Sequence, residues 1–181
     1  MRKHILYKSW AAAAALSFAC GAAIARDPAP STGVGLLDAT CEVVGISDGD
    51  TFKARCPYEQ IRVRFAGIDA PESGQAFGRV AKQYLAQLIF RKHVRVAQSK
   101  ATRSYGRIVA NVYDERGQDV GLMMVGAGLA WHYKRFAREQ TPSARLAYMR
   151  AEEVARAQTL GLWADPHAQP PWELRHRAKA Q

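Results

Sequence analysis

An Asp-Gly pair at Asp48-Gly49 lies midway between two short segments in which apolar residues recur. The segments run from Cys41 to Ile46 and from Thr51 to Cys56. Asp-Gly between two such runs is the strongest short-range signal for a β-hairpin, because both central turn residues then accept a positive φ. The sequence therefore predicts two antiparallel strands that meet at this turn.

The same turn brings two cysteines into register. If the turn is centred on Asp48-Gly49, Cys41 lies directly opposite Cys56, and opposed positions of a ladder are close enough to be bridged. The remaining cysteine, Cys20, precedes the hairpin in the N-terminal segment. We predict a Cys41–Cys56 disulfide, and two buried free thiols are the alternative.

Three further strands follow from alternation of apolar and polar residues, at 61–65, 94–98 and 108–113. Helical spacing predicts a helix over 75–90, a short helix near 120–127 and a third from the Thr141 cap to Gly161. The pattern indicates an α+β chain that is mainly a β barrel, with five strands and three helices, and it is compatible with an OB-fold.

Apolar spacing also assigns the buried faces of the helices. Val80 joins the stripe of the first helix, and Leu146 and Val154 join that of the last. The methionines of the last two helices, Met149 among them, are expected in the core.

Basic residues, an apolar run and small residues succeed one another at the N-terminus. This layout is typical of a secretory signal peptide over residues 1–25, so we expect an exported chain, periplasmic or secreted. An uncleaved anchor and a lipoprotein attached at Cys20 are alternatives. Residues 26–38 are expected to form a flexible leader, 39–164 one domain, and 165–181 a basic, Pro-containing tail that stays on the surface or frays.

The chain carries a formal charge of +10, and removal of Arg2, Lys3 and Lys8 with the leader would leave +7, because no acidic residue is lost. A basic mature chain favours anionic partners. Charge alone is equally compatible with a cationic surface that has no specific ligand.

Three carboxylates and two arginines stand near predicted strand ends: Asp50, Asp69, Glu72, Arg64 and Arg107. Carboxylate oxygens are ligands for Ca²⁺ or Mg²⁺. Guanidinium groups bind phosphate oxygens through two hydrogen bonds, and a remaining carboxylate can activate water. The combination points to phosphodiester hydrolysis, and we interpret the neighbouring Asp48 as structural.

These motifs, Asp48-Gly-Asp-Thr51, Arg64-Phe-Ala-Gly-Ile-Asp-Ala-Pro-Glu72 and Tyr105-Gly-Arg107, closely resemble those of the staphylococcal nuclease (thermonuclease) family, in its order and at its spacing. The resemblance covers about residues 41–163. It implies an OB-fold barrel with three helices and a Ca²⁺-dependent phosphodiesterase that cleaves DNA and RNA to leave 3′-phosphate and 5′-hydroxyl ends.

The resemblance also implies residue roles. Asp50, Asp69 and the carbonyl of Ala70 would bind the metal, and Glu72 would be the general base. Arg64 and Arg107 would clamp the phosphate. Tyr105 would contact a phosphate and Tyr133 would stack on a base.

We therefore expect a monomeric nuclease with DNA and RNA as its partners and no membrane span in the mature chain. The alternative is an OB-fold module that binds nucleic acid, or another anionic polymer of the envelope, without cleaving it. Ca²⁺ is favoured over Mg²⁺ only by the resemblance, and the sequence leaves the preferred nucleic acid open.

Overall fold

A computed structural model describes residues 36–99 and 104–179 of the chain. The expected signal peptide, its Cys20 alternative and most of the expected leader lie outside these residues. Five strands form a closed barrel in the order β1-β2-β3-β6-β5. They are β1 (Asp38–Ile46), β2 (Thr51–Arg55), β3 (Gln60–Phe65), β5 (His93–Gln98) and β6 (Ile108–Tyr113). The barrel class predicted from the sequence is confirmed.

The predicted hairpin forms, with one irregularity. Glu42 pairs with Arg55, as a turn centred on Asp48-Gly49 requires, but Gly45 pairs with Lys53 because a β-bulge interrupts β1. A bulge adds one residue to one strand and increases its twist, which suits a strand that must curve around a barrel. On the side of the bulge away from the turn, the pairing of β1 with β2 has the predicted register.

The predicted disulfide lies in that matching part of the ladder. Cys41 and Cys56 are bonded to each other with their Cα atoms 4.3 Å apart, and both are buried. The bridge closes the open end of the hairpin, so it ties β1 to the end of β2.

The barrel closes through one parallel and four antiparallel pairings. β3 runs parallel to β6, and β1 pairs with β5. In β3 the apolar residues point inward and Arg62 and Arg64 point away, as the alternation predicts. The barrel interior is therefore filled by alternate residues of every strand, among them Val43, Phe52, Val63, Val96 and Val112.

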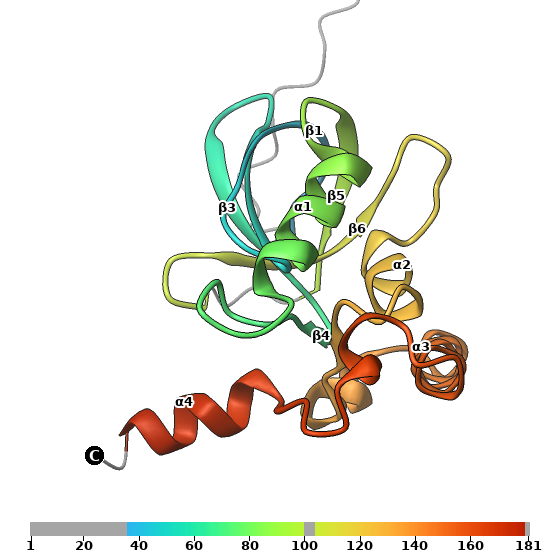
Figure 1. Ribbon diagram of the computed structural model, residues 1–181. Coiled ribbons are helices and arrows are strands. Elements are labelled where there is room, and N and C mark those ends of the chain that lie inside the picture. The colour runs from blue at the N-terminus through green and yellow to red at the C-terminus, as the bar shows by residue number, and fades with distance from the viewer. Residues whose placement is uncertain (1–35, 100–103, 180–181) are drawn as a thin grey trace, which may run out of the picture. The chain divides into compact units, whose positions relative to one another are not determined.

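Helix α1 (Gly78–Ile89) packs across the barrel through a narrower stripe than predicted (Figure 1). Its buried residues are Gly78, Ala81, Leu85 and Ile89. The expectation that Val80 joins this stripe was wrong, since its exposed fraction is 46%. Seven apolar residues span a wider arc of the helix than the barrel can cover.

Helices α2 (Val120–Gly126) and α3 (Pro142–Ala157) contact each other beside the barrel. The buried face of α3 was predicted wrongly. Leu146, Met149 and Val154 are exposed, and the face turned inward carries Tyr148, Glu152 and Ala155. Its polar members, Tyr148 and Glu152, bind partners elsewhere in the fold, so apolar spacing alone could not identify them.

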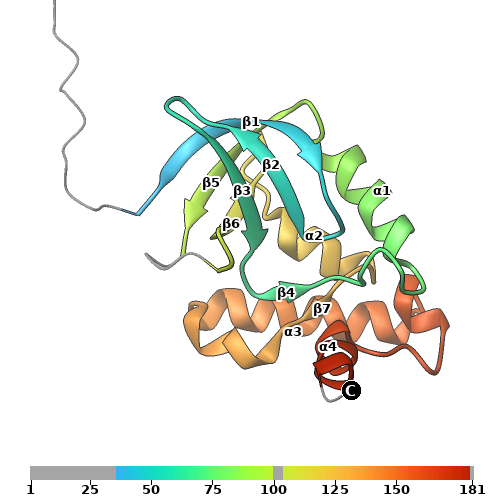
Figure 2. The same cartoon turned by 90° about the vertical axis from the view of Figure 1, so that its left-hand side faces the viewer.

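Two very short strands connect the barrel to the helices. β4 (Ile68–Asp69) pairs antiparallel with β7 (Trp131–His132), and Figure 2 shows this pair between the barrel and helices α3 and α4. Two 3-10 helices, η1 (Lys134–Glu139) and η2 (Gly161–Ala164), follow β7 and α3. None of these four elements was expected from the sequence patterns.

The C-terminal tail was also predicted wrongly. It forms an α-helix, α4 (Pro171–Lys179), so the described residues contain an α-helix beyond the three expected. Pro171 is buried, and the indole ring of Trp172 stacks on Tyr133. α4 is therefore attached to the domain by contacts from distant sequence.

Among the residues that the structure describes, no helix has both the length and the apolar character needed to cross a membrane.

Candidate active site

Asp50 reaches the site because the β1–β2 turn packs tightly against two other segments. A Cβ on Gly49 would lie 2.7 Å from Cβ of Ala70 and 2.8 Å from Cβ of Ala81, so only glycine fits there without displacement. The neighbouring Asp50 is buried, and its Oδ2 accepts a hydrogen bond from the backbone N of Ala70 at 2.7 Å. The close approach at Gly49 thus joins the turn to the segment that carries Asp69.

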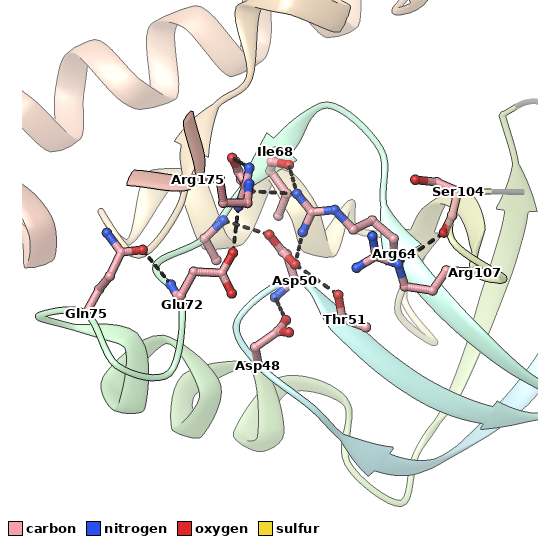
Figure 3. Close-up of polar contacts among 12 residues, drawn as sticks. Asp48, Asp50, Thr51, Arg64, Ile68, Glu72, Gln75, Ser104, Arg107 and Arg175 are labelled. Atoms are coloured by element: carbon pink, nitrogen blue, oxygen red, sulfur yellow. Dashed lines mark hydrogen bonds and ion pairs between the residues drawn. The ribbon is translucent and has the colours of Figure 1, made fainter. Parts of the chain in front are cut away.

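Asp69 belongs to β4 and has no exposed surface. Arg64, at the end of β3, extends its guanidinium between Asp69 and Asp50 and forms an ion pair with each. Its Nη2 donates to Oδ1 of Asp69 at 2.7 Å. Figure 3 shows the side chains of Arg64 and Asp50 in contact.

The pKa directions in this cluster follow from burial and charge. Burial by itself lowers the pKa of Arg64, but Asp50 and Asp69 outweigh it and raise that pKa above its usual range. Burial raises the pKa of Asp69, and the neighbouring Arg64 opposes the rise. Arg64 therefore remains charged and stabilises two carboxylates that burial alone would disfavour.

This donor set fits a hard cation. Two buried carboxylates converge on one positively charged group, and oxygen ligands of this kind suit Ca²⁺. Within residues 36–99 and 104–179, no group of three or more His, Cys, Asp or Glu side chains gathers in a way that could hold a metal ion. A cation here would need Asp50 and Asp69 supplemented by backbone oxygen, such as the Ala70 carbonyl, and by water.

Glu72 follows β4 on a loop that folds tightly against the start of α1. A Cβ on Gly78 would lie 2.0 Å from the carbonyl oxygen of Glu72, so glycine permits this approach. The backbone N of Glu72 donates to Oε1 of Gln75 at 2.8 Å. The Glu72 side chain is about half exposed, so water can reach it.

Arg107 lies in the short turn that precedes β6. Its Nε donates to the carbonyl of Ser104 at 3.2 Å, and its guanidinium lies 6.0 Å from the ring centre of Tyr105. Burial, followed by the repulsion of Arg64, lowers the pKa of Arg107. The guanidinium groups of Arg64 and Arg107 therefore repel each other, and a bound anion would relieve that repulsion.

Asp48 makes a contact within the turn and also lines the site, so its structural role stays a prediction. Its Oδ1 accepts a hydrogen bond from the backbone N of Asp50 at 3.0 Å. Burial, together with the nearby Asp50 carboxylate, raises the pKa of Asp48 to about 6.

The predicted site residues meet in one cleft of about 610 Å³. It is lined by Asp50, Arg64, Ala70, Glu72, Tyr105, Arg107 and Tyr133, together with Trp172, Arg175 and others. Asp69 does not line the cleft, but it contacts Arg64 and Arg175, which do.

Tyr133 has neighbours that the sequence analysis did not anticipate. The ring of Trp172 stacks on it, with centres 5.0 Å apart and planes inclined by 15°, and the Phe136 ring meets it edge-on. Trp172 therefore covers one face of the Tyr133 ring, which was predicted to stack on a base.

Sequence reasoning missed the contribution of α4, which brings Trp172, Arg175 and His176 to the cleft. The tail was recognised only as basic, and it lies more than 100 residues from Asp69 in sequence. No periodicity or spacing links residues so far apart.

The model of the family described as "Staphylococcal nuclease homologue" matches residues 62–165. The match includes Arg64, Asp69, Glu72 and Arg107. It begins after Asp50 and ends before α4.

Curated relatives match a longer part of the chain. A protein of Shigella flexneri named micrococcal nuclease is 44% identical over 146 residues, which cover 76% of this chain and 81% of that protein. Protein ParB of Escherichia coli is 40% identical over 145 residues, with coverages of 76% and 79%. An uncharacterized endonuclease of Haemophilus influenzae is 41% identical over 141 residues, with coverages of 77% and 75%.

Proposed function

The chain belongs to the staphylococcal nuclease family, and we propose that it is a Ca²⁺-dependent endonuclease that cleaves DNA and RNA to leave 3′-phosphate and 5′-hydroxyl ends. Family membership makes it a nuclease that hydrolyses phosphodiester bonds. One observation carries the finer proposal, namely that Arg64, Arg107 and Glu72 line a single cleft next to the buried pair Asp50 and Asp69.

The two arginines bind the phosphate of the scissile bond. A guanidinium offers paired N–H donors, and its charge stabilises the negative charge that develops on the phosphate oxygens during attack. Arg107 has only a backbone carbonyl of Ser104 as a hydrogen-bond partner among the described residues. Its remaining N–H groups have no partner within the described part of the chain, and they can bind phosphate.

Asp50, Asp69 and the Ala70 carbonyl would hold the divalent cation. When bound, it would supply Lewis-acid stabilisation of the phosphate charge. Arg64 pairs with both carboxylates, and a cation at the same carboxylates would free its N–H groups for the substrate.

Glu72 accepts the proton of the attacking water. It is the exposed carboxylate of the cleft, whereas Asp50 and Asp69 are buried. A general base must be reachable by water and within hydrogen-bond distance of it when the substrate is bound. The oxygen of the water then attacks phosphorus, the bond to the 5′ oxygen of the leaving nucleotide breaks, and that oxygen takes up a proton from solvent water to become the 5′-hydroxyl.

Substrate binding relies on charge and on exposed rings. Without the expected leader of residues 1–25, which holds Arg2, Lys3 and Lys8, the chain carries +7, so its affinity for nucleic acid falls as salt concentration rises. Tyr105 is 86% exposed beside Arg107, where it can contact phosphate or sugar. The stacked rings of Tyr133 and Trp172 together would offer a surface for a base, and such stacking does not depend on base identity.

The proposed setting is outside the cytoplasm, with the chain acting as a monomer. The leader pattern of residues 1–25 supports export, and the Cys41–Cys56 disulfide suits an oxidising compartment. Fractionation of cells that express the full chain would test this, since a cytoplasmic product with its leader intact would contradict export.

The function is tested with single-stranded DNA, duplex DNA and RNA, each incubated with Ca²⁺, Mg²⁺ or chelator. The wild type is compared with Glu72→Gln, which keeps the side-chain shape, and with Glu153→Gln as a control on the exposed face of α3. We expect Ca²⁺-dependent cleavage that Glu72→Gln abolishes and Glu153→Gln retains, with product 3′ ends that polymerase extends only after phosphatase treatment.

Each other result has a definite meaning. Cleavage that persists in chelator would refute the metal dependence, and directly extendable ends would refute the product assignment. Binding without cleavage under every condition would support the module that binds nucleic acid without cutting it.

A further inference from the structure

Arg175 of α4 contacts two carboxylates of the site with one guanidinium group (Figure 3). Its Nη2 donates to Oδ2 of Asp69 at 2.5 Å, and its Nη1 donates to Oε1 of Glu72 at 2.6 Å. Arg175 lies beyond the part of the chain that the family model matches. It has no role in the function proposed above.

Glu72 depends on this contact for its orientation. Its side chain is half exposed on a loop, and among the described residues Arg175 is the only side chain that binds its carboxylate. Asp69 is completely buried in β4. By bridging the two, Arg175 fixes the Glu72 carboxylate relative to the buried centre.

A second contact joins the same loop to the segment before α4. Gln75 accepts a hydrogen bond from the backbone N of Glu72, and its Nε2 donates to the carbonyl of Gln169 at 3.3 Å. The C-terminal segment thus supports both the backbone and the side chain of Glu72.

The attachment of α4 does not depend on Arg175. Trp172 stacks on Tyr133 and meets Trp131 edge-on with ring centres 6.2 Å apart, and Pro171 is buried. Replacement of Arg175 should therefore leave the helix in place and remove only the bridge.

We propose that Arg175 is a positioning residue of the nuclease site, which holds the carboxylate of Glu72 in place against Asp69. The proposal rests on the proposed function, in which Glu72 is the base. Helix α4 would then supply a residue that the active site needs for catalysis.

Because Arg175 is positively charged, its replacement should change Ca²⁺ affinity and turnover in opposite directions. Its guanidinium competes with a metal cation for the oxygens of Asp69 and repels it, so Arg175→Ala should bind Ca²⁺ more tightly than the wild type. Turnover should nevertheless fall, because Glu72 loses its orientation, and small displacements of catalytic groups reduce rates by up to about 100-fold. A merely structural loss would weaken metal binding and turnover together.

The test compares Arg175→Ala and Arg175→Lys with the matched control Arg177→Ala. Arg177 lies on the same helix, is exposed, and contacts Gln169 and Glu173 rather than the site. The measurements are kcat and KM for a fluorogenic oligonucleotide at saturating Ca²⁺, Ca²⁺ affinity by calorimetry, and hydrogen exchange of residues 70–77 in the metal-free protein.

For Arg175→Ala we expect kcat to fall by about 10- to 100-fold with little change in KM, tighter Ca²⁺ binding and faster exchange in the loop. Arg175→Lys should recover part of kcat, because one ammonium can still contact both carboxylates. Arg177→Ala should behave as the wild type in all three measurements.

Three results would overturn the proposal: an unchanged kcat for Arg175→Ala, weaker Ca²⁺ binding, or unchanged exchange over residues 70–77. The exchange measurement needs no activity, so it tests the bridge even in a protein that does not cleave. A wild type without cleavage under any condition would instead refute the proposed function, and the catalytic role of Arg175 with it.

Discussion

Arg64 donates a hydrogen bond from Nη2 to Oδ1 of Asp69 at 2.7 Å, although Asp69 is completely buried and is also the residue proposed to bind metal. The same guanidinium pairs with Asp50. The protein therefore compensates its buried carboxylates with an internal cation when no metal is bound.

Removal of Ca²⁺ should consequently stop cleavage and leave the fold intact. The Arg64→Ala variant should behave differently, because loss of one partner of a buried ion pair typically costs about 3 kcal/mol or more. We expect it to be destabilised in chelator and to recover part of that loss in Ca²⁺. Urea unfolding with and without Ca²⁺ measures both effects, and a variant as stable as the wild type in chelator would refute this account of the site.

Arg107→Ala should reduce turnover and leave stability nearly unchanged. Its guanidinium contacts only the Ser104 carbonyl and the Tyr105 ring among the described residues, so the fold loses little. Loss of one donor to the transition state typically reduces kcat by about 10²- to 10³-fold. Arg116→Ala, in an exposed turn, is the control, and equal kcat in the two variants would remove Arg107 from the mechanism.

Gly78→Ala should impair cleavage through the backbone of Glu72. A Cβ at position 78 would lie 2.0 Å from the Glu72 carbonyl oxygen, so the loop has to move. Gly74→Ala is a matched control, because no atom lies within 4 Å of the Cβ that it adds to the same loop. We expect lower kcat for Gly78→Ala alone, and a crystal structure of that variant with the loop unmoved would contradict the explanation.

Glu152→Ala should destabilise the protein and weaken the site. Glu152 is buried, accepts a hydrogen bond from the backbone N of His132 at 3.1 Å, and pairs with Lys134. The variant would leave a buried N–H unsatisfied, at a cost of about 1 to 3 kcal/mol. His132 lies in β7, which pairs with the strand of Asp69, so activity should fall as well. Thermal unfolding beside Glu153→Ala checks this, and equal midpoints would refute it.

The Cys41→Ala/Cys56→Ala variant should lose about 3 kcal/mol of stability, as expected for a loop of this length in the chain-entropy model. The site should still form in the folded fraction, because the bridge lies at the far end of the hairpin from Asp50. Denaturant unfolding measures the loss. A mass measurement on unreduced wild type that finds two free thiols would contradict the disulfide itself.

Local rules account for the elements that the sequence predicted correctly. The Asp-Gly turn indicated the first two strands and their disulfide, and alternation identified the other three barrel strands, because a strand with one buried face must repeat every second residue. Only the β1 bulge departs from that register. The motifs likewise identified residues that the fold gathers in one cleft, from Asp50 to Arg107.

The same rules failed where a polar contact decided the packing. The inward face of α3 contains Tyr148, whose hydroxyl donates to Asp119 at 2.8 Å, and Glu152, which binds β7. Both residues have a polar group that needs a distant partner, and spacing along one helix does not reveal that partner. Exposed Met149 and Val154 were therefore mistaken for core.

The sequence by itself determined the barrel strands, their disulfide and the chemistry of the central residues, since these depend on turn type, alternation and residue identity. Only the tertiary structure decided that α4 returns to the site and that Arg175 bridges Asp69 and Glu72. That contact joins residues 106 and 103 positions apart. It follows from how Pro171 and Trp172 pack against the folded domain, and no local pattern encodes such packing.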